Sequence, residues 1–410
     1  MSGCGAESGL ISLDQALDKM ITATPCLEVE TLQLQQGLHR YLAEDIYAGI
    51  DLPLFSQSAV DGYALCSDGE IAPGEQFQLV GEIRAGQSAD VTLQRGQAMR
   101  IFTGAPIPAG TTTVARQEIV QRMSSHLIQL EAALKLHADI RDVGEEISQG
   151  QLLASAGQYL NIGVIAALSM AGIDQVQVYQ QPKVAVLITG DEVAQSAADL
   201  QAGKIFDANA PLIAAWCQAR HQPVHIVHVE DNEIALIRYF QQLQEEYDVI
   251  ISTGGISVGD YDFIRPVALN TGFEQVFWKV KQKPGKPVFF AKYRKSANKF
   301  CHLLALPGNP AAVYVGMSIY TQTLLEVLQG QSQPPAWWTG QIQHDLKPDA
   351  RERILRMAAC FEDGVLKLHS LAKQQSHMLS NLMYANCLVR VPAHQSIQKG
   401  QCLKGIFIQH

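Results

Sequence analysis

The feature that most constrains the fold of this chain is a regular alternation of apolar runs and longer amphipathic segments after Lys183. The runs at 184–188, 224–229 and 249–251 are short and rich in β-branched residues, which is typical of strands buried on both faces of a parallel sheet. A helical segment begins at about Asn209 after the first run, and another ends at Glu246 after the second. This succession predicts an α/β domain with a doubly wound parallel sheet.

Paired glycines follow the third run. Gly254 and Gly255 allow backbone conformations that cost other residues about 1 to 2 kcal/mol, and they let a ligand approach the main chain. Ser257 adds a hydroxyl, and Asp260 and Asp262 follow it. In open α/β sheets ligands bind beyond the carboxyl ends of the strands. The segment therefore fits either an anion and cation site or a plain strand-to-helix turn capped by an Asp.

Acidic residues also follow the other two runs. Asp191 and Glu192 come after the first, and Glu230 and Asp231 come after the second. Carboxyl ends of parallel strands lie at the same edge of the sheet, so we expect one crevice to be faced by Asp191, Glu192, Asp231, Asp260 and Asp262. The alternative is that each acid independently caps a helix.

Cationic residues occur in one irregular segment, Trp278–Pro287, which contains Lys279, Lys281, Lys283 and Lys286. Such a run is usually a solvated surface, but an oxyanion ligand of an acidic chain would need it. Pro307-Gly-Asn-Pro310 then precedes an apolar helix expected from 311 to 328. The amino end of that helix would offer unpaired amides to an anion.

The flanking regions predict further domains. Residues 51–149 and 331–410 alternate short apolar runs with turns, which is typical of a β-rich insert and a β-barrel-like C-terminal domain. Residues 1–50 and 150–181 form a discontinuous mixed domain, and 182–330 form the α/β domain. Ser12 and Gln15 form a capping box that predicts a helix start.

Composition excludes several classes. The net charge of -9 disfavours a broad nucleic-acid surface. No run of about 20 apolar residues and no leader-like start is evident, so we expect no membrane association and a cytoplasmic location. The eight cysteines form no zinc or disulfide pattern, and His225 and His228 would lie on opposite faces of a strand, which disfavours zinc there.

Together, the glycine loop, the strand-end acids and the lysines suit metal-assisted chemistry on a phosphorylated or nucleotide-bearing substrate. A phosphate-binding lysine loop, a dinucleotide fingerprint and a nucleophile elbow are all missing, which disfavours ordinary ATPases, dehydrogenases and serine hydrolases.

Seven motifs in order give a specific resemblance. They are Ser58–Ala64, Arg100–Pro106, Thr189–Glu192, Phe206–Asn209, Ser252–Gly259, Lys283–Pro287 and Leu306–Pro310. The chain resembles, nearly end to end, the molybdopterin molybdenumtransferase (MoeA) family, which includes the E domain of gephyrin.

The resemblance implies an elongated homodimer that inserts molybdate into adenylylated molybdopterin and releases AMP with help from Mg²⁺. It implies that the substrate comes from a molybdopterin adenylyltransferase, which is a possible partner. It also implies that Asp61 and Thr103 reach the crevice of the other subunit. The implied catalytic residues are Asp61, Thr103, Glu192, Asp231 and Asp262, of which Glu192, Asp231 and Asp262 would hold the metal. The implied anion-binding residues are Gly254, Gly255, Ser257, Lys279, Lys283, Lys286, Pro307 and Pro310, with Arg351 and Ser376 as looser matches.

Departures and alternatives remain. Val60, Arg116 and the Asp142-Val143 pair stand where relatives often carry Met, an apolar residue and arginines, which puts an anion-binding role of the loop at Arg141 in doubt. An adenylyltransferase or a nucleotide-hydrolysing relative would share the α/β domain but would lack the flanking β domains. A non-catalytic scaffold of the gephyrin type is the third alternative.

Overall fold

The structure is a computed structural model that describes residues 10–190, 193–194, 198, 203–256 and 262–408. The chain divides into two compact units. The first comprises Met1–Thr31, His39–Ala43 and Gln177–His410, and the second comprises Leu32–Leu38 and Glu44–Val176. The domain boundaries expected from the sequence stay a proposal.

A six-stranded sheet organises the first unit. Its order is β16 (Val224–Val229), β13 (Val184–Thr189), β17 (Val249–Thr253), β21 (Phe300–Leu306), β20 (Phe289–Arg294) and β18 (Glu274–Trp278). The first four strands are parallel, as predicted. β20 runs antiparallel to β21 because a short hairpin connects the two, and a short connection permits no parallel pairing. β18 pairs antiparallel with β20 at the edge of the sheet. The predicted doubly wound sheet is thus confirmed, with a mixed edge.

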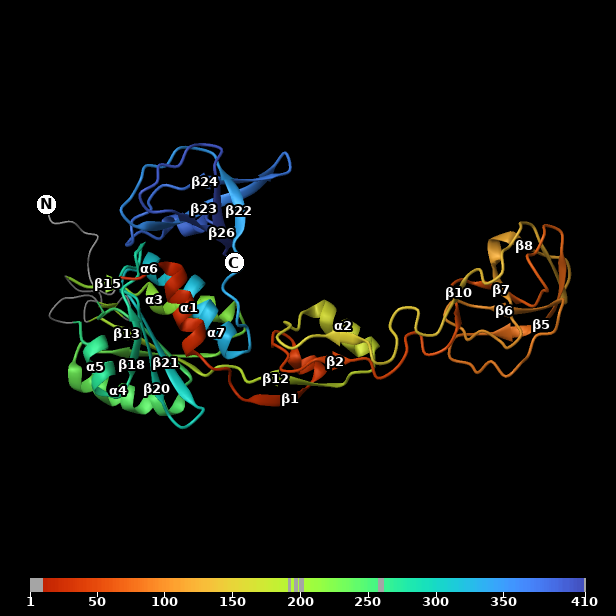
Figure 1. The fold of residues 1–410 in the computed structure, drawn as a ribbon, viewed down its shortest axis with the longest axis horizontal. Coiled ribbons are helices and arrows are strands. Elements are labelled where there is room, and N and C mark those ends of the chain that lie inside the picture. Colours follow the sequence, from red (N-terminus) through yellow and green to blue (C-terminus); the bar gives the residue numbers. More distant parts are fainter. Residues whose placement is uncertain (1–9, 191–192, 195–197, 199–202, 257–261, 409–410) are drawn as a thin grey trace. The chain divides into compact units, whose positions relative to one another are not determined.

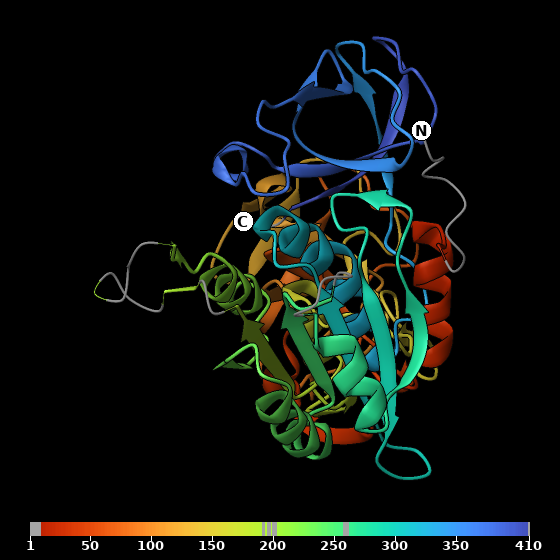
Figure 2. The same ribbon diagram turned by 90° about the vertical axis from the view of Figure 1, so that its left-hand side faces the viewer.

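Helices cover both faces of this sheet (Figures 1 and 2). Val186 and Ile188 of β13 pack in one core cluster with α1 (Leu13–Ala23), α3 (Asn209–Gln218), α6 (Pro310–Gly316), the π-helical η4 (Met317–Thr321) and α7 (Gln322–Leu328). Ala185 and Leu187 pack in the other with α4 (Glu233–Glu246) and α5 (Ile264–Asn270). The alternation of side chains along one strand therefore supplies both cores.

The helix start predicted at Ser12 is confirmed. The Ser12 hydroxyl accepts the Gln15 amide at 3.1 Å, and the Ser12 amide donates to Gln15 Oε1 at 2.9 Å. The same α1 packs in the core of the α/β sheet.

One helical stretch of the described residues, Pro310–Leu328, is long and apolar enough to cross a membrane by length and composition. Because 89% of its apolar window is buried inside the fold, it has the pattern of a core helix.

The C-terminal region forms a closed β-barrel in the same unit. Its sheet runs β19 (Gln282–Lys283), β23 (Glu352–Glu362), β24 (Val365–Ser370), β22 (Trp338–Ile342), β26 (Cys402–Phe407) and β25 (Cys387–Val391), and β25 also pairs with β23. The short strand β19 comes from the lysine segment of the α/β domain. The predicted β-rich C-terminal region is therefore tied to the α/β domain through its own sheet.

An ion-pair network joins this barrel to α1. Arg390 of β25 donates to both carboxylate oxygens of Asp14, at 2.6 and 2.9 Å, and to Glu352 at 2.6 Å. The side chains of Arg390 and Glu352 are only 11% and 16% exposed, so solvent screens this pair weakly, whereas Asp14 is 64% exposed and its pair is screened more strongly.

The second unit is β-rich, as predicted. Its main sheet runs β7 (Thr113–Arg116), β4 (Gly62–Leu65), β6 (Gln97–Ile101), β5 (Gln76–Ile83), β9 (Leu127–Leu130) and β8 (Val120–Arg122). Smaller elements are η1 (Leu34–Gly37), β2 (Ile46–Tyr47), β3 (Gln57–Ser58), η2 (Gln117–Ile119), β10 (Ile140–Arg141), β11 (Leu152–Ala154) and α2 (Ile162–Met170). The remaining short elements of the chain are β1 (Val29–Gln33), paired with β12 (Gln175–Tyr179), β14 (Val193–Ala194), paired with β15 (Ile205–Phe206), and η5 (Ser380–Met383).

Candidate functional site

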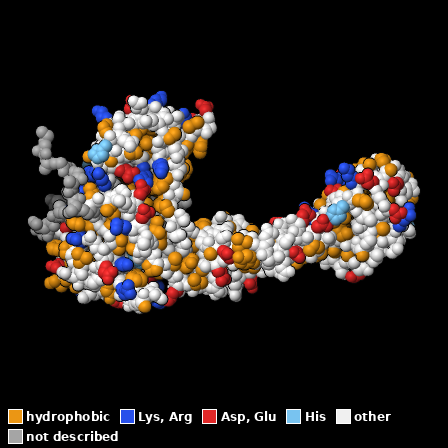
Figure 3. All heavy atoms as spheres, in the orientation of Figure 1, with side chains coloured by type: hydrophobic (Ala, Val, Ile, Leu, Met, Phe, Trp, Pro, Cys, Tyr) orange, Lys and Arg blue, Asp and Glu red, His pale blue; other side chains and the backbone are white. Residues whose placement is uncertain are grey.

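A cavity of about 700 Å³ lies where the loops after β17 and β21 meet the barrel. We call it the lysine–arginine cavity, because its charged lining consists of Lys283, Lys286, Arg351, Arg353, Asp262 and Asp349. Figure 3 shows Lys and Arg side chains beside Asp and Glu side chains along the junction of the barrel and the α/β domain. Among the described lining residues four are cationic and two are acidic, so the local charge is positive in a chain of net charge -9.

One wall of this cavity, which we call the glycine floor, contains Gly255, and Gly254 precedes it in the chain. Gly254 and Gly255 have φ of 88° and 61°, which confirms the predicted conformational requirement. A Cβ on Gly254 would lie 2.8 Å from Thr189 Oγ1, and one on Gly255 would lie 2.9 Å from a side-chain carbon of Ile264. Only glycine fits both positions without displacing these neighbours.

The lysine segment is fixed by the barrel. In the pairing of β19 with β23, Lys283 lies opposite Arg353. The neighbouring Gln282 is fully buried and accepts the Tyr320 hydroxyl at 2.5 Å, while its carbonyl accepts Arg351 Nη1 at 3.3 Å. These contacts hold the backbone of the segment, so the ammonium groups of the lysines are presented from a rigid support.

Asp349 is the closest counter-charge to Lys283. Its Oδ2 accepts Lys283 Nζ at 2.9 Å, and its Oδ1 accepts the Arg351 amide at 3.1 Å. Partial burial alone would raise the pKa of Asp349, but the hydrogen bonds from Lys283 and Arg351 outweigh burial and hold it below its ordinary value. Asp349 is therefore ionised at neutral pH. An anion that enters the cavity competes with Asp349 for the ammonium group of Lys283.

A buried arginine shapes the barrel side of the cavity. Arg356 is 1% exposed, and its guanidinium donates to the carbonyls of Lys373, Gln375 and Met378. The three carbonyls belong to one loop, residues 373–378, and their hydrogen bonds fold this loop around the guanidinium. The loop places Ser376 in the cavity wall. Burial lowers the pKa of Arg356, although it stays charged at neutral pH.

The amino end of α6 does not offer unpaired amides. Pro310 has no N–H, and the Ala311 amide donates to the Ser376 carbonyl at 3.0 Å. The two amides that follow donate to the Asn309 carbonyl at 2.9 and 3.0 Å. The expectation that this helix end offers unpaired amides is therefore wrong, because protein carbonyls already occupy its first donors.

A second cavity, of about 610 Å³, lies at the ends of β13 and β16. We call it the acidic cavity; its charged or titratable lining residues are Lys204, His228, Glu230 and Asp231. His228 Nε2 lies 2.8 Å from Oδ2 of Asp207, whose other oxygen accepts two amides at the start of α3. His228 is thus paired with a carboxylate outside the lining.

The predicted acids do not all meet. Asp231 lines the acidic cavity and Asp262 lines the lysine–arginine cavity, although both follow strands that end at the same edge of the sheet. Glu192 and Ser257 lie outside the described residues. Within the described part of the chain, no group of three carboxylates is close enough to hold one ion.

Some of the predicted anion-binding residues line the lysine–arginine cavity, and others do not. Those that line the lysine–arginine cavity are Gly255, Lys283, Lys286, Pro307, Arg351 and Ser376. Gly254 and Pro310 are chain neighbours of lining residues. Lys279 is not among the lining residues; its ammonium lies 4.2 Å from the centre of the Trp278 ring.

Asp61 and Thr103 belong to the second unit and contact each other. The Thr103 amide and hydroxyl donate to the same oxygen of Asp61, at 2.9 and 2.8 Å. These two hydrogen bonds lower the pKa of Asp61, which is fully exposed. The loop therefore presents an ionised carboxylate held in one orientation.

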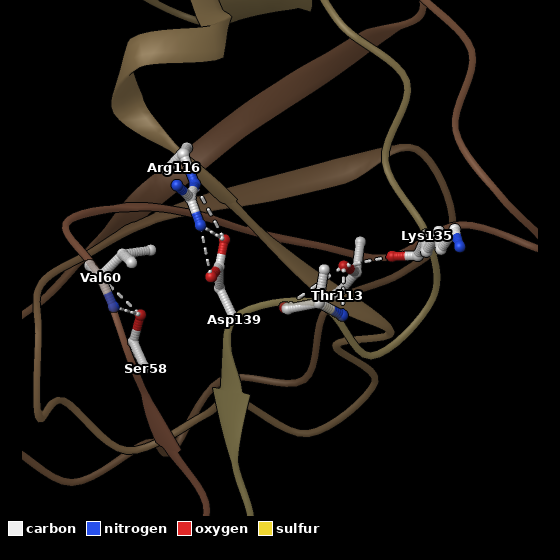
Figure 4. Close-up of polar contacts among 7 residues, drawn as sticks. Ser58, Val60, Thr113, Arg116, Lys135 and Asp139 are labelled. Carbon is white, nitrogen blue, oxygen red and sulfur yellow. Dashed lines mark hydrogen bonds and ion pairs between the residues drawn. The ribbon is translucent and has the colours of Figure 1, made fainter.

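Figure 4 shows the polar contacts of Val60 and Arg116, two of the unusual residues of this unit. Arg116 makes a bidentate pair with Asp139, at 2.9 to 3.2 Å, and the Val60 carbonyl accepts the Ser58 hydroxyl at 2.6 Å. The polar Arg116 is thus explained by a carboxylate partner. Asp142 pairs with His137 at 2.8 Å.

Comparison with known families decides the relationship. The model described as MoeA N-terminal region (domain I and II) matches 11–172, a probable molybdopterin binding domain matches 185–326, and the MoeA C-terminal region (domain IV) matches 339–407. The molybdopterin molybdenumtransferase of Haemophilus influenzae is 32% identical over 93% of this chain and 94% of that protein. The chain belongs to the molybdopterin molybdenumtransferase family.

Two further relatives agree with this assignment. The molybdopterin molybdenumtransferase of a Staphylococcus epidermidis strain is 31% identical over 93% of this chain and 91% of its own length. A crystal structure of the molybdopterin biosynthesis MoeA protein of Pyrococcus horikoshii has a TM-score of 0.77 at 25% identity, covering 98% of this chain and 100% of that one. The MoeA-like architecture thus extends over the whole described chain.

Three residues that line or support the lysine–arginine cavity of this molybdopterin molybdenumtransferase family member were not predicted from the sequence. Asp349 and Arg353 line it, and Gln282 supports it from beneath. The Asp-x-Arg spacing of Asp349 and Arg351 could have indicated the local turn. The contact with Lys283, 66 residues away in sequence, carries no local signal.

Proposed function

We propose that this chain inserts molybdate into molybdopterin, using an adenylylated form of the pterin and releasing AMP. The observation that carries the proposal is the lysine–arginine cavity, which combines a glycine floor with four cationic side chains in an otherwise acidic protein. Relatives named molybdopterin molybdenumtransferases support the same reaction. The adenylyltransferase and hydrolase alternatives would leave the matched N-terminal and C-terminal regions unexplained.

The cationic side chains of the lysine–arginine cavity explain why an oxyanion would bind there. A lysine or guanidinium at about 4 Å from an anion gains about 4 kcal/mol at an effective dielectric of 20, before desolvation. Lys283 and Arg351 come from different domains, and both line the cavity. The Lys283 ammonium pairs with Asp349, and the Arg351 guanidinium donates to the carbonyl of Gln282, the residue before Lys283. In our proposal they bind molybdate or phosphate oxygens, and Arg351 contributes a planar fork.

The remaining residues have proposed roles that follow from their chemistry. Asp262, in the lysine–arginine cavity, would supply a carboxylate toward a divalent cation, for which we propose Mg²⁺, since hard oxygen ligands suit it. Asp231 would offer its carboxylate separately, in the acidic cavity. When bound, such a cation would neutralise charge on the phosphoanhydride. Asp61, oriented by Thr103, is proposed to act from the second unit of a partner subunit.

A homodimer is part of the proposal. Helix α2 is almost wholly apolar, yet only Leu168 is buried, and Ile162 is 79% exposed. Figure 3 shows hydrophobic side chains gathered over this helix. An apolar helix face of this kind fits a second copy of the chain. We also propose a cytoplasmic location and substrate supply by a molybdopterin adenylyltransferase.

The direct test mixes purified protein with adenylylated molybdopterin, molybdate and Mg²⁺ and follows AMP by chromatography. We expect AMP release that depends on both molybdate and the cation. If the protein retains the pterin but releases no AMP with molybdate, a binding or scaffold role replaces the enzymatic one. Removing the cation with EDTA separately tests the proposed Mg²⁺ requirement.

A further inference from the structure

The outer surface of the β23–β24 hairpin carries three side chains of different chemistry. Alternation along β23 turns Met357 and Ala359 into the barrel core and places Cys360 and Glu362 on the outside. His369 of β24 lies opposite Ala358, so it shares that outer face. None of the three lines the lysine–arginine cavity.

The donor atoms of these side chains are already close together. Cys360 Sγ lies 3.3 Å from Glu362 Oε1, and His369 Nε2 lies 3.5 Å from the same oxygen. All three donors lie within 4.8 Å of one another, and they are the one group of this kind among the described residues. A tetrahedral Zn²⁺ with ordinary bond lengths separates its sulfur, nitrogen and oxygen ligands by roughly 3.4 to 3.6 Å. Two of the three separations therefore match a zinc site.

The surroundings of His369 supply a second, independent observation. Its Nε2 is shielded from solvent and, beyond the 3.5 Å ion-pair contact with Glu362 Oε1, has no hydrogen-bond partner, although the side chain as a whole is 43% exposed. Lys367, directly opposite Cys360 in the hairpin, donates its ammonium to Gln341 on β22 at 2.9 Å. The nearest cation is thus engaged on the neighbouring strand.

We propose that Cys360, Glu362 and His369 bind a zinc-type transition-metal cation on the outside of the barrel, with water as the fourth ligand. A thiolate and a carboxylate balance the charge of Zn²⁺, and the sulfur and imidazole donors select against Mg²⁺. Binding replaces the Cys360 S–H bond by a Zn–S bond and releases the proton to solvent. The site is distinct from the proposed molybdate chemistry and does not depend on it.

The hydrogen bond to Glu362 raises the pKa of the Cys360 thiol. His369 faces Glu362 on the same hairpin, and Lys367 is the other charged group opposite Cys360.

The test measures alkylation of Cys360 by iodoacetamide in the full-length protein, resolved by peptide mass spectrometry, with and without Zn²⁺. At free Zn²⁺ ten times the dissociation constant, we expect alkylation of Cys360 to slow about tenfold, since only the unbound fraction reacts. Cys402, an exposed thiol of the same barrel, is the matched control and should alkylate at an unchanged rate.

Two variants separate a three-residue site from adventitious thiol binding. His369→Ala and Glu362→Gln change exposed side chains, so both should fold, which circular dichroism checks. We expect each to lose most of the zinc protection of Cys360. Equal alkylation of wild-type Cys360 with and without Zn²⁺ would overturn the proposal, as would full protection in His369→Ala.

Discussion

The two cavities at the carboxyl edge of the α/β sheet have opposite character although their strands are neighbours. The acidic cavity at β13 and β16 is lined by the α/β domain alone, and Glu230 and Asp231 dominate it. The lysine–arginine cavity at β17 and β21 gains Arg351 and Arg353 from the barrel. This difference indicates that the carboxyl edge of the sheet forms the cavities, whereas the C-terminal barrel supplies the positive charge that favours an oxyanion in one of them.

A matched pair of glycine substitutions tests the rigid floor of the lysine–arginine cavity and should give the largest effect. Gly254→Ala forces a left-handed residue and a Cβ 2.8 Å from Thr189 Oγ1, so we expect a loss of about 3 kcal/mol of unfolding free energy. Gly203→Ala, beside the acidic cavity, has φ of 90° and nothing within 4 Å, so about 1 kcal/mol is expected. Urea unfolding measures the free energy of unfolding of both variants. Equal losses would mean that the left-handed backbone conformation alone, and not the close contact with Thr189, destabilises Gly254→Ala.

Removing one cation from each cavity compares their affinity for anions. We expect Arg351→Met to weaken molybdate binding about 30-fold, because it removes a charge-assisted contact and the bond that holds the Gln282 carbonyl. Lys204→Met in the acidic cavity should change binding less than about twofold. Isothermal titration calorimetry with molybdate checks both. A larger loss in Lys204→Met would reverse the assignment of the two cavities.

Removing one carboxylate from each cavity should have a smaller effect. Asp349→Asn releases Lys283 from its 2.9 Å ion pair, so we expect molybdate to bind about fivefold more tightly. Glu230→Gln in the acidic cavity is the control and should leave binding unchanged. If Asp349→Asn instead weakens binding, Asp349 positions Lys283 rather than competing with the anion.

The smallest effect concerns acid stability. The pKa of Asp349 is lowered in the folded protein, so its contribution is present above its unfolded value near 4 and is lost as pH falls through the folded value. Lys283 is 53% exposed, and solvent screening limits the contribution to about 0.5 kcal/mol. The free energies of unfolding of wild type and Asp349→Asn, measured with urea, should differ at pH 7 and converge at pH 3. The same difference at both pH values would exclude a contribution from the ionisation of Asp349.

Local rules predicted much of the fold. The capping box at Ser12, the apolar strands and the glycine pair at Gly254 each depend on neighbours in sequence, and each was found. The separation of Asp231 from Asp262 was not predictable, since strand order alone puts both at one edge. The occupied amide of Ala311 in α6 was also not predictable, because its partner, the Ser376 carbonyl, comes from the barrel.

The central claim is that an oxyanion binds in the lysine–arginine cavity, and anomalous diffraction from crystals soaked in molybdate tests it most directly. The account predicts a molybdenum peak within hydrogen-bonding distance of Lys283 and Arg351. A peak in the acidic cavity, or none in the lysine–arginine cavity at saturating molybdate, would contradict it.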